Sequence, residues 1–187
     1  MARRIGLVYE DENLRIISES VTRKVLGPQT DFEGLLGGSW PGFKGDVAKL
    51  LQVLNVKHLS APLDKVFVIV DANGEDPQER EDSLSQKIRN RTYPFGEPKL
   101  YAIKRQSETW LIADASAVNT AAGAHVTPPI AEPETFKDPK RYLIQRLRNS
   151  GQEFTRQFVR DAASHLDIEV LGRAFKEFPR LRNMLER

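Results

Sequence analysis

An uninterrupted apolar run that ends in a polar cluster is the feature that most constrains the fold of this chain. The run covers residues 66–70, and Asp71, Asn73 and Asp76 follow it. Branched apolar residues without polar alternation are typical of a strand buried on both faces, as in a parallel sheet covered by helices. Ligands of such sheets bind beyond the carboxyl ends of the strands, where Asp71 and Asn73 would lie. We therefore expect the functional site there.

Strand-like and helix-like segments alternate over the first part of the chain, which predicts an α/β fold. Strands are expected at residues 4–9, 31–36, 65–71 and 99–104. Helices are expected after Asp11, which can cap the first of them, and at about 45–57, 77–91 and 108–114. This alternation is typical of a doubly wound, mostly parallel and Rossmann-like sheet that is flanked by helices.

The character of the sequence changes after residue 115. Small residues and prolines over 115–135 predict a loop-rich connection, and the residues from 138 onward predict helices. We therefore predict an α/β core at residues 1–115. Residues 116–187 would form a helical C-terminal extension that packs on this core within one compact domain.

Composition excludes several classes of protein. The 187 residues are 40% hydrophobic and 29% charged, no apolar run is long enough to cross a membrane, and the basic N-terminus turns acidic at residues 10–12. The absence of cysteine excludes disulfides, thiolate metal sites and a cysteine nucleophile. The histidines at positions 58, 125 and 165 lack zinc-ligand spacing, and no Gly-x-Ser-x-Gly elbow supports a serine hydrolase. We expect a cytoplasmic protein without a membrane segment.

Basic residues are concentrated in the C-terminal third of the chain, although the net charge is only +2. They are Lys140, Arg141, Arg146, Arg148, Arg156, Arg160, Arg173, Lys176, Arg180, Arg182 and Arg187. A basic face of this kind suits nucleic acid. An ordinary solvated helix surface carries similar charges, so the pattern alone leaves both interpretations open.

A cation site is predicted where the first and third strands end. Asp71 and Asn73 can present two oxygens to one ion, because residues two apart in an extended chain point to the same side. Glu10 follows the first strand and would supply a third oxygen if the two strands are neighbours. Asp76 can reach the cluster through the turn at Gly74. Because Mg²⁺ prefers oxygen ligands together with water and substrate phosphates, we expect Mg²⁺ (or Mn²⁺) at this site. Alternatively, Glu10 is simply stabilised by the positive end of the following helix.

The loop at residues 37–44 imitates a Walker A phosphate loop without being one. Phe43 separates Gly42 from Lys44, and Pro41 removes a backbone donor. Lys44 precedes a helix and can still reach a substrate phosphate, so we predict that it binds substrate. The other interpretation is a solvated loop lysine.

Lys104 and Glu108 complete the candidate residues. Lys104 ends a strand at the same edge of the sheet, where an ammonium group could neutralise charge that develops on a transferred phosphoryl group. Glu108 begins a helix four residues later, and we predict that it contacts substrate. Its alternative roles are a helix N-terminal acid or a partner of Lys104.

Several of these landmarks resemble a known family of domains. Glu10 with the following Asp-Glu-Asn-Leu-Arg-Ile-Ile resembles the acidic motif that opens a Toprim domain, and Asp71-Ala72-Asn73 resembles its second motif, which is usually Asp-x-Asp. The segments 42–45, 108–114 and 175–178 resemble a stand-alone Toprim-like family of uncharacterised bacterial proteins. Members of that family are often encoded beside ATPases in restriction and phage-defence loci.

The resemblance implies Mg²⁺-dependent phosphodiester hydrolysis of the nuclease type, acting on nucleic acid together with an ATPase partner. Glu10 would ligate metal or act as general acid/base, and Asp71 would hold one or two ions. The chain departs from the family at Asn73, where a carboxylate is expected. Asp76 or Glu75 would then have to compensate for the missing charge.

Two further interpretations remain open at the level of sequence. Asn73 and the basic C-terminal helices favour a non-catalytic Toprim-like module that binds nucleic acid or regulates a partner. A receiver-type phosphoacceptor would use Asp71 as acceptor and Lys104 as the distal lysine. That fold needs another strand between the two, and residues 72–98 contain no apolar run to supply it.

Overall fold

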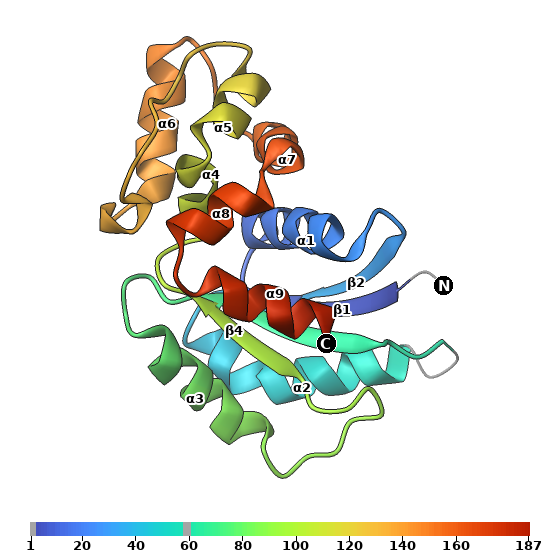
Figure 1. The fold of residues 1–187 in the computed structure, drawn as a ribbon. Helices are drawn as coiled ribbons and strands as arrows, with labels where there is room; N and C mark the ends of the chain where they lie inside the picture. The colour runs from blue at the N-terminus through green and yellow to red at the C-terminus, as the bar shows by residue number, and fades with distance from the viewer. Residues whose placement is uncertain (1–2, 58–60) are drawn as a thin grey trace.

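A four-stranded parallel sheet forms the centre of the protein (Figure 1). The computed structural model describes residues 3–57 and 61–187. The strands are β1 (Arg3–Tyr9), β2 (Thr30–Leu36), β3 (Lys65–Asp71) and β4 (Lys99–Ile103). Their order is β2-β1-β3-β4, and every neighbouring pair is parallel. The α/β, Rossmann-like fold class predicted from the sequence is therefore confirmed.

Helices cover both faces of this sheet, as parallel strands require. The helices that follow the first three strands are α1 (Glu12–Leu26), α2 (Gly42–Lys57) and α3 (Pro77–Ile88). The later ones are α4 (Glu108–Ala113), α5 (Ala115–Ala122), the 3₁₀ turn η1 (Pro133–Thr135), α6 (Pro139–Asn149), α7 (Arg156–His165), α8 (Ile168–Ala174) and α9 (Phe178–Glu186). Figure 1 shows α1 and α9 on one face, with α2 and α3 on the other.

The two faces of the sheet bury separate apolar clusters. On β1, Ile5 and Leu7 belong to the cluster that contains α1, α9 and the C-terminal helices, whereas Val8 belongs to the α2–α3 cluster. Gly6 lies against Leu54 of α2, and a Cβ built on Gly6 would come within 2.8 Å of that side chain. The missing side chain at Gly6 therefore allows α2 to pack closely on the central strand.

The chain from 115 to 135 differs from the predicted loop-rich connection, because its first part is the helix α5. The Asp114 side chain caps this helix by accepting from the Ala117 N–H, and Gly123 ends it in the left-handed conformation. Alanine is the best helix former, so small residues here favour a helix rather than a loop. Elsewhere, α2 begins at Gly42, earlier than expected, and α3 ends at Ile88 instead of continuing to 91.

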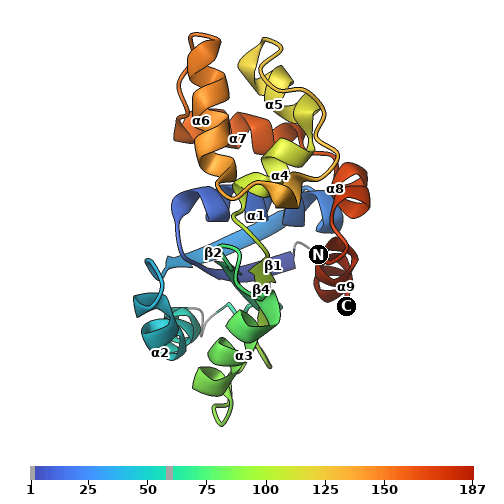
Figure 2. The ribbon, with the colours of Figure 1, turned by 90° about the vertical axis from the view of Figure 1, so that its left-hand side faces the viewer.

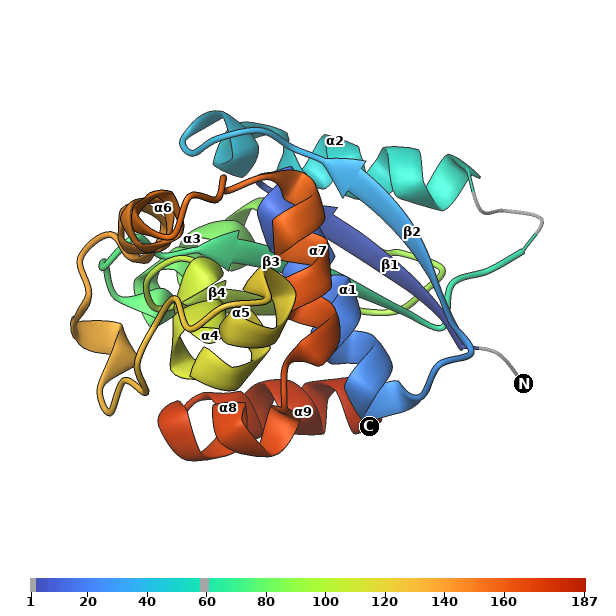
Figure 3. The same ribbon diagram turned by 90° about the horizontal axis from the view of Figure 1, so that it is seen from above.

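Helices α5, α6 and α7 stack outside α1, on the side away from α2 and α3 (Figure 2). In the view from above, α7 crosses directly over α1 (Figure 3). Ser20 Oγ donates to the Ala163 carbonyl at 2.6 Å, and Lys24 Nζ donates to the Ser164 carbonyl at 2.7 Å. Within residues 3–57 and 61–187, no helix is both long and apolar enough to span a membrane.

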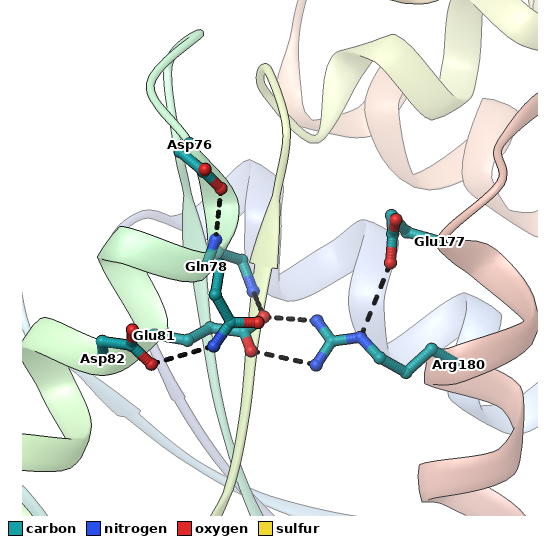
Figure 4. Close-up of polar contacts among 7 residues, drawn as sticks. Asp76, Gln78, Glu81, Asp82, Glu177 and Arg180 are labelled. Carbon is teal, nitrogen blue, oxygen red and sulfur yellow. Dashed lines mark hydrogen bonds and ion pairs between the residues drawn. The ribbon is translucent and has the colours of Figure 1, made fainter.

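Strand β4 lies at an edge of the sheet. A buried carboxylate accepts a hydrogen bond from one of its backbone N–H groups that no neighbouring strand pairs (Figure 4). Glu81 of α3 accepts from the Ala102 N–H at 2.9 Å. Arg180 of α9 holds the same carboxylate with both terminal nitrogens, and its Nη1 lies 2.9 Å from Glu81 Oε2. The Arg180 guanidinium also lies 5.0 Å from the centre of the Tyr101 ring. These contacts join helices from opposite faces around one edge strand.

We predict that Arg180→Ala lowers the free energy of unfolding by about 1–3 kcal/mol, because it leaves the buried Glu81 carboxylate without its cation. Urea denaturation measures the effect. Arg182→Ala is the matched control, since Arg182 lies on the same helix and forms only exposed ion pairs with Glu169 and Glu186. Its cost should stay within about 1 kcal/mol. Equal losses in the two variants would contradict the role given to Arg180.

Candidate functional site

The candidate site lies where the connections from the two central strands leave the sheet in opposite directions. β1 leads into α1 on one face, and β3, its neighbour, leads into α3 on the other. Glu10 follows β1 and Asp71 ends β3. The two strands are neighbours, as the predicted cation site requires. The Asp71 N–H donates to Glu10 Oε2 at 2.9 Å. Open α/β sheets bind ligands at this kind of switch point.

Asp71 is a buried acid of the site, and one of its oxygens is unpartnered. Its residue is only 6% exposed, and its Oδ1 atom has no hydrogen-bond partner. The Ser107 backbone N–H donates to the carboxylate, which favours the charged form. Burial nevertheless raises the pKa of Asp71 well above its usual value, and the nearby carboxylates of Glu108, Asp11 and Glu10 raise it further. An orphaned oxygen among four acids is a position that favours a cation.

Glu108 and Asp11 lie on the α1 side of Asp71. Glu108 is 3% exposed, and its Oε1 accepts from Asn13 Nδ2 at 3.0 Å. Burial raises the pKa of Glu108, while the hydrogen bond from Asn13 and the charge of Lys140, whose Nζ lies 3.9 Å away, oppose this shift. Asp11 caps α1 by accepting from the Leu14 N–H at 2.9 Å, as predicted.

Glu10 is held from the β2 side by the loop that leads into α2. The Trp40 N–H hydrogen-bonds to the Glu10 carboxylate, and the Gly37 N–H donates to the Tyr9 carbonyl at 2.8 Å. Burial raises the pKa of Glu10, whereas the backbone N–H groups of Asp71 and Trp40 and the charge of Arg80 oppose the rise. The loop at 37–41 therefore acts as one wall of the site.

Arg80 is the residue that sequence reasoning missed. It is 5% exposed, its Nη1 has no hydrogen-bond partner, and its guanidinium lies 4.0 Å from the centre of the Trp40 ring. Glu75 Oε2 lies 2.9 Å from Nε, as an ion pair outside hydrogen-bond geometry. One signal was present in the sequence. A cation in the first turn of a helix is destabilised by the positive end of the helix dipole. An arginine at position 80 therefore indicates a role other than stabilising α3.

The two predicted lysines have different surroundings. Lys44 begins α2, and its Nζ lies 5.7 Å from the centre of the Trp40 ring, the ring that Arg80 also contacts. Lys44 therefore stands on the Glu10 side of the site. Lys104 instead forms an ion pair with Glu134 at 2.6 Å, so its ammonium group is directed to the turn η1.

Asn73 and Asp76 do not join the carboxylate cluster. Asn73 is exposed in the left-handed region with φ of 52°, and its Oδ1 accepts from Gln106 Nε2 at 3.3 Å. Its backbone N–H donates to the Arg105 carbonyl, so the chain has already turned away from the strand direction. Asp76 caps α3 by accepting from the Gln78 N–H at 2.8 Å. The alternation argument for Asn73 is therefore wrong, because the extended conformation ends at Asp71.

The donor set fits a hard divalent cation. Asp71 Oδ1 is buried and unpartnered, Glu10 is its hydrogen-bonded neighbour, and both offer the oxygen ligands that Mg²⁺ prefers. Among the described residues, no three His, Asp or Glu side chains are already arranged around one point. Asp71 and Glu10 are thus the residues that would hold an ion, with water and substrate oxygens completing its coordination.

Comparison of the chain with protein-family models, with curated proteins and with solved structures finds no match. Function is therefore inferred from the residues at the carboxyl edge of the sheet.

We predict that Asp71→Asn stabilises the metal-free protein at pH 7 by about 1 kcal/mol, because it removes a charge that burial disfavours. The raised pKa of Asp71 means that folding favours its protonated form. The contribution of Asp71 to stability is therefore fully present below its ordinary pKa of 3.8, and it is lost as pH rises through the raised value. The advantage of the variant should shrink as pH falls toward 3.8. Urea titrations in EDTA at several pH values measure it.

The exposed Asp31 provides the control for this experiment. Asp31→Asn should change stability by less than about 0.5 kcal/mol at every pH. An Asp71→Asn protein that is less stable than the wild type at pH 7 would show that the charged carboxylate supports the fold.

Proposed function

We propose that this protein is a Toprim-like, Mg²⁺-dependent phosphodiester hydrolase of the nuclease type. The observation that carries the proposal is the unpartnered Oδ1 of Asp71, buried among Glu10, Asp11 and Glu108. Burial raises the pKa values of Glu10, Asp71 and Glu108, so their charged forms are destabilised unless a cation neutralises them. Such arrangements are kept where function requires them.

The residues around the cluster divide the work of this chemistry. Glu10 and Asp71 hold the ion, which when bound polarises a phosphoryl oxygen and lowers the pKa of water. In its alternative role as general acid/base, Glu10 has a pKa that burial brings closer to the range in which a carboxyl group exchanges protons near neutral pH. Arg80 and Lys44 both lie close to the Trp40 ring, where they bind a substrate phosphate.

The resemblance to Toprim-like defence proteins extends the proposal to nucleic acid as substrate and to an ATPase as partner. Coupling to an ATPase would place the hydrolase in a bacterial defence or DNA-processing system. Co-purification of the tagged protein with ATPases encoded next to it tests this part. The hydrolase proposal does not depend on the result.

We predict that Mg²⁺ or Mn²⁺ supports cleavage of DNA or RNA, and that Glu10→Gln and Asp71→Asn each reduce the rate at least 100-fold. Losing one oxygen ligand removes both metal affinity and the charge that holds the ion. Calorimetry should show weaker Mg²⁺ binding in both variants. Asp82→Asn is the control, since Asp82 is exposed on α3 and accepts only from Gln78. Cleavage that survives both substitutions would refute the proposal.

We predict that Arg80→Met lowers kcat/KM at least tenfold and leaves Mg²⁺ affinity nearly unchanged. The charge of Arg80 lowers the pKa of Glu10, so its loss raises that pKa further. The acidic limb of the pH–rate profile should therefore move to higher pH. Arg89→Met is the control on the exposed end of α3. An unchanged pH profile would separate Arg80 from the reacting site.

A non-catalytic Toprim-like module is the second candidate, and the position of Asn73 favours it. The family's second acidic residue is replaced by an amide that turns toward Gln106, outside the cluster. If calorimetry detects no Mg²⁺ binding while nucleic acid still binds, this candidate replaces the hydrolase.

A receiver-type phosphoacceptor does not fit the topology. Residues 72–98 are all described, and they contain α3 but no strand between β3 and β4. The distal lysine of such a fold would also have to face Asp71, whereas Lys104 pairs with Glu134.

A further inference from the structure

Two hollows lie along the helices α1 and α7, and we call them together the α1–α7 groove. The smaller one measures about 310 Å³, and Asp11, Lys140 and Arg156 help to line it. A second hollow of about 800 Å³ follows along the same two helices, between Arg15 and Ser164. Figure 3 shows α7 lying over α1. Residues of these helices line both hollows, and Asp11 of the acidic cluster lines the smaller one.

Basic side chains dominate the walls of the larger hollow. Its charged lining consists of Arg15, Arg23, Lys24, Arg160 and one acid, Glu19. Arg15 is already paired with Glu12 and Glu19, whereas Arg160 has no ion-pair partner in the described part of the chain. The same is true of Arg156 in the smaller hollow. These two arginines are exposed and are free to pair with an external anion.

Arg156 and Arg160 are spaced to contact a chain of phosphates. They lie four residues apart on α7 and hence on one side of the helix, about 6 Å apart along its axis. Lys140 adds a third cation at the cluster end, 3.9 Å from Glu108. An anion with repeated charges fits this row better than a single phosphate does.

Phe154 adds a flat apolar surface to the smaller hollow, which Lys140 and Arg156 also line. It lines the smaller hollow, it is only partly buried, and its ring lies 6.0 Å from that of Phe158. A partly exposed aromatic ring beside arginines is the combination on which unpaired bases stack in single-strand binding proteins.

We propose that the α1–α7 groove binds a single nucleic-acid strand, with Arg156 and Arg160 on successive phosphates and Phe154 under a base. The direction of the strand, toward Asp71, rests on the proposed function, whereas binding itself does not. A duplex cannot offer an unstacked base to Phe154, so the groove should prefer single strands.

Fluorescence anisotropy in EDTA tests this proposal without cleavage of the probe. Labelled oligo-dT and oligo-U represent the two sugars, and a blunt-ended duplex represents double-stranded nucleic acid. We predict that Arg156→Ala and Arg160→Ala each weaken single-strand binding several-fold and reduce the salt slope of log K by about 0.7. The Arg→Lys variants should retain the wild-type slope. Phe154→Leu should weaken binding of single strands about tenfold and that of the duplex much less.

Arg89→Ala is the matched control, because Arg89 is exposed on the opposite face of the sheet. It should bind both probes as the wild type does. Wild-type affinity and salt slope in both groove arginine variants would overturn the proposal, as would an equal loss in Arg89→Ala. If the wild-type protein cleaves no probe with Mg²⁺ or Mn²⁺ but shows this binding pattern, the hydrolase proposal is refuted and the proposal for the α1–α7 groove stands.

Discussion

The parallel pairing of β1 and β3 is the constraint on which the rest of the structure depends. Both strands are buried on both faces, so the connections that follow them must cross the sheet as helices. Because the strands are parallel, their carboxyl ends lie at the same edge, and the helices that leave on opposite faces open a space between them. Glu10 and Asp71 meet there, where the Asp71 backbone N–H donates to the Glu10 carboxylate. The site is thus a consequence of sheet topology.

This arrangement places several carboxylates in a buried position, where their negative charge destabilises the folded state. Desolvation raises the pKa values of Glu10, Asp71 and Glu108, so each charged carboxylate opposes folding near neutral pH. The apolar layers on the two faces of the sheet supply the stability that the cluster lacks. Functional sites in general contain destabilising groups of this kind, and the rest of the fold offsets their cost.

Local patterns in the sequence were sufficient for the strands and for part of the site. Continuous apolar runs predicted β1 and β3, and the acid after each run predicted Glu10 and Asp71. Arg80 was missed because its importance comes from Trp40, forty positions earlier, which only the folded chain brings against it. The side-chain partners of Asn73 and Lys104, which are Gln106 and Glu134, were missed for a related reason. The loop at 72–74 pairs with residues 103–105, and this non-local pairing sets where both side chains point.

The ion pair between Glu81 and Arg180 at the edge strand β4 has a consequence for biosynthesis. Glu81 and Arg180 are separated by 99 positions, so the cation arrives long after the strand and helix that it joins have been made. While a ribosome is still adding α9, the β1–β3 face lacks Leu181 and Leu185, and Glu81 remains an uncompensated anion. The nascent protein therefore exposes apolar surface until nearly all of these 187 residues have emerged. Its dependence on chaperones should be concentrated in that interval.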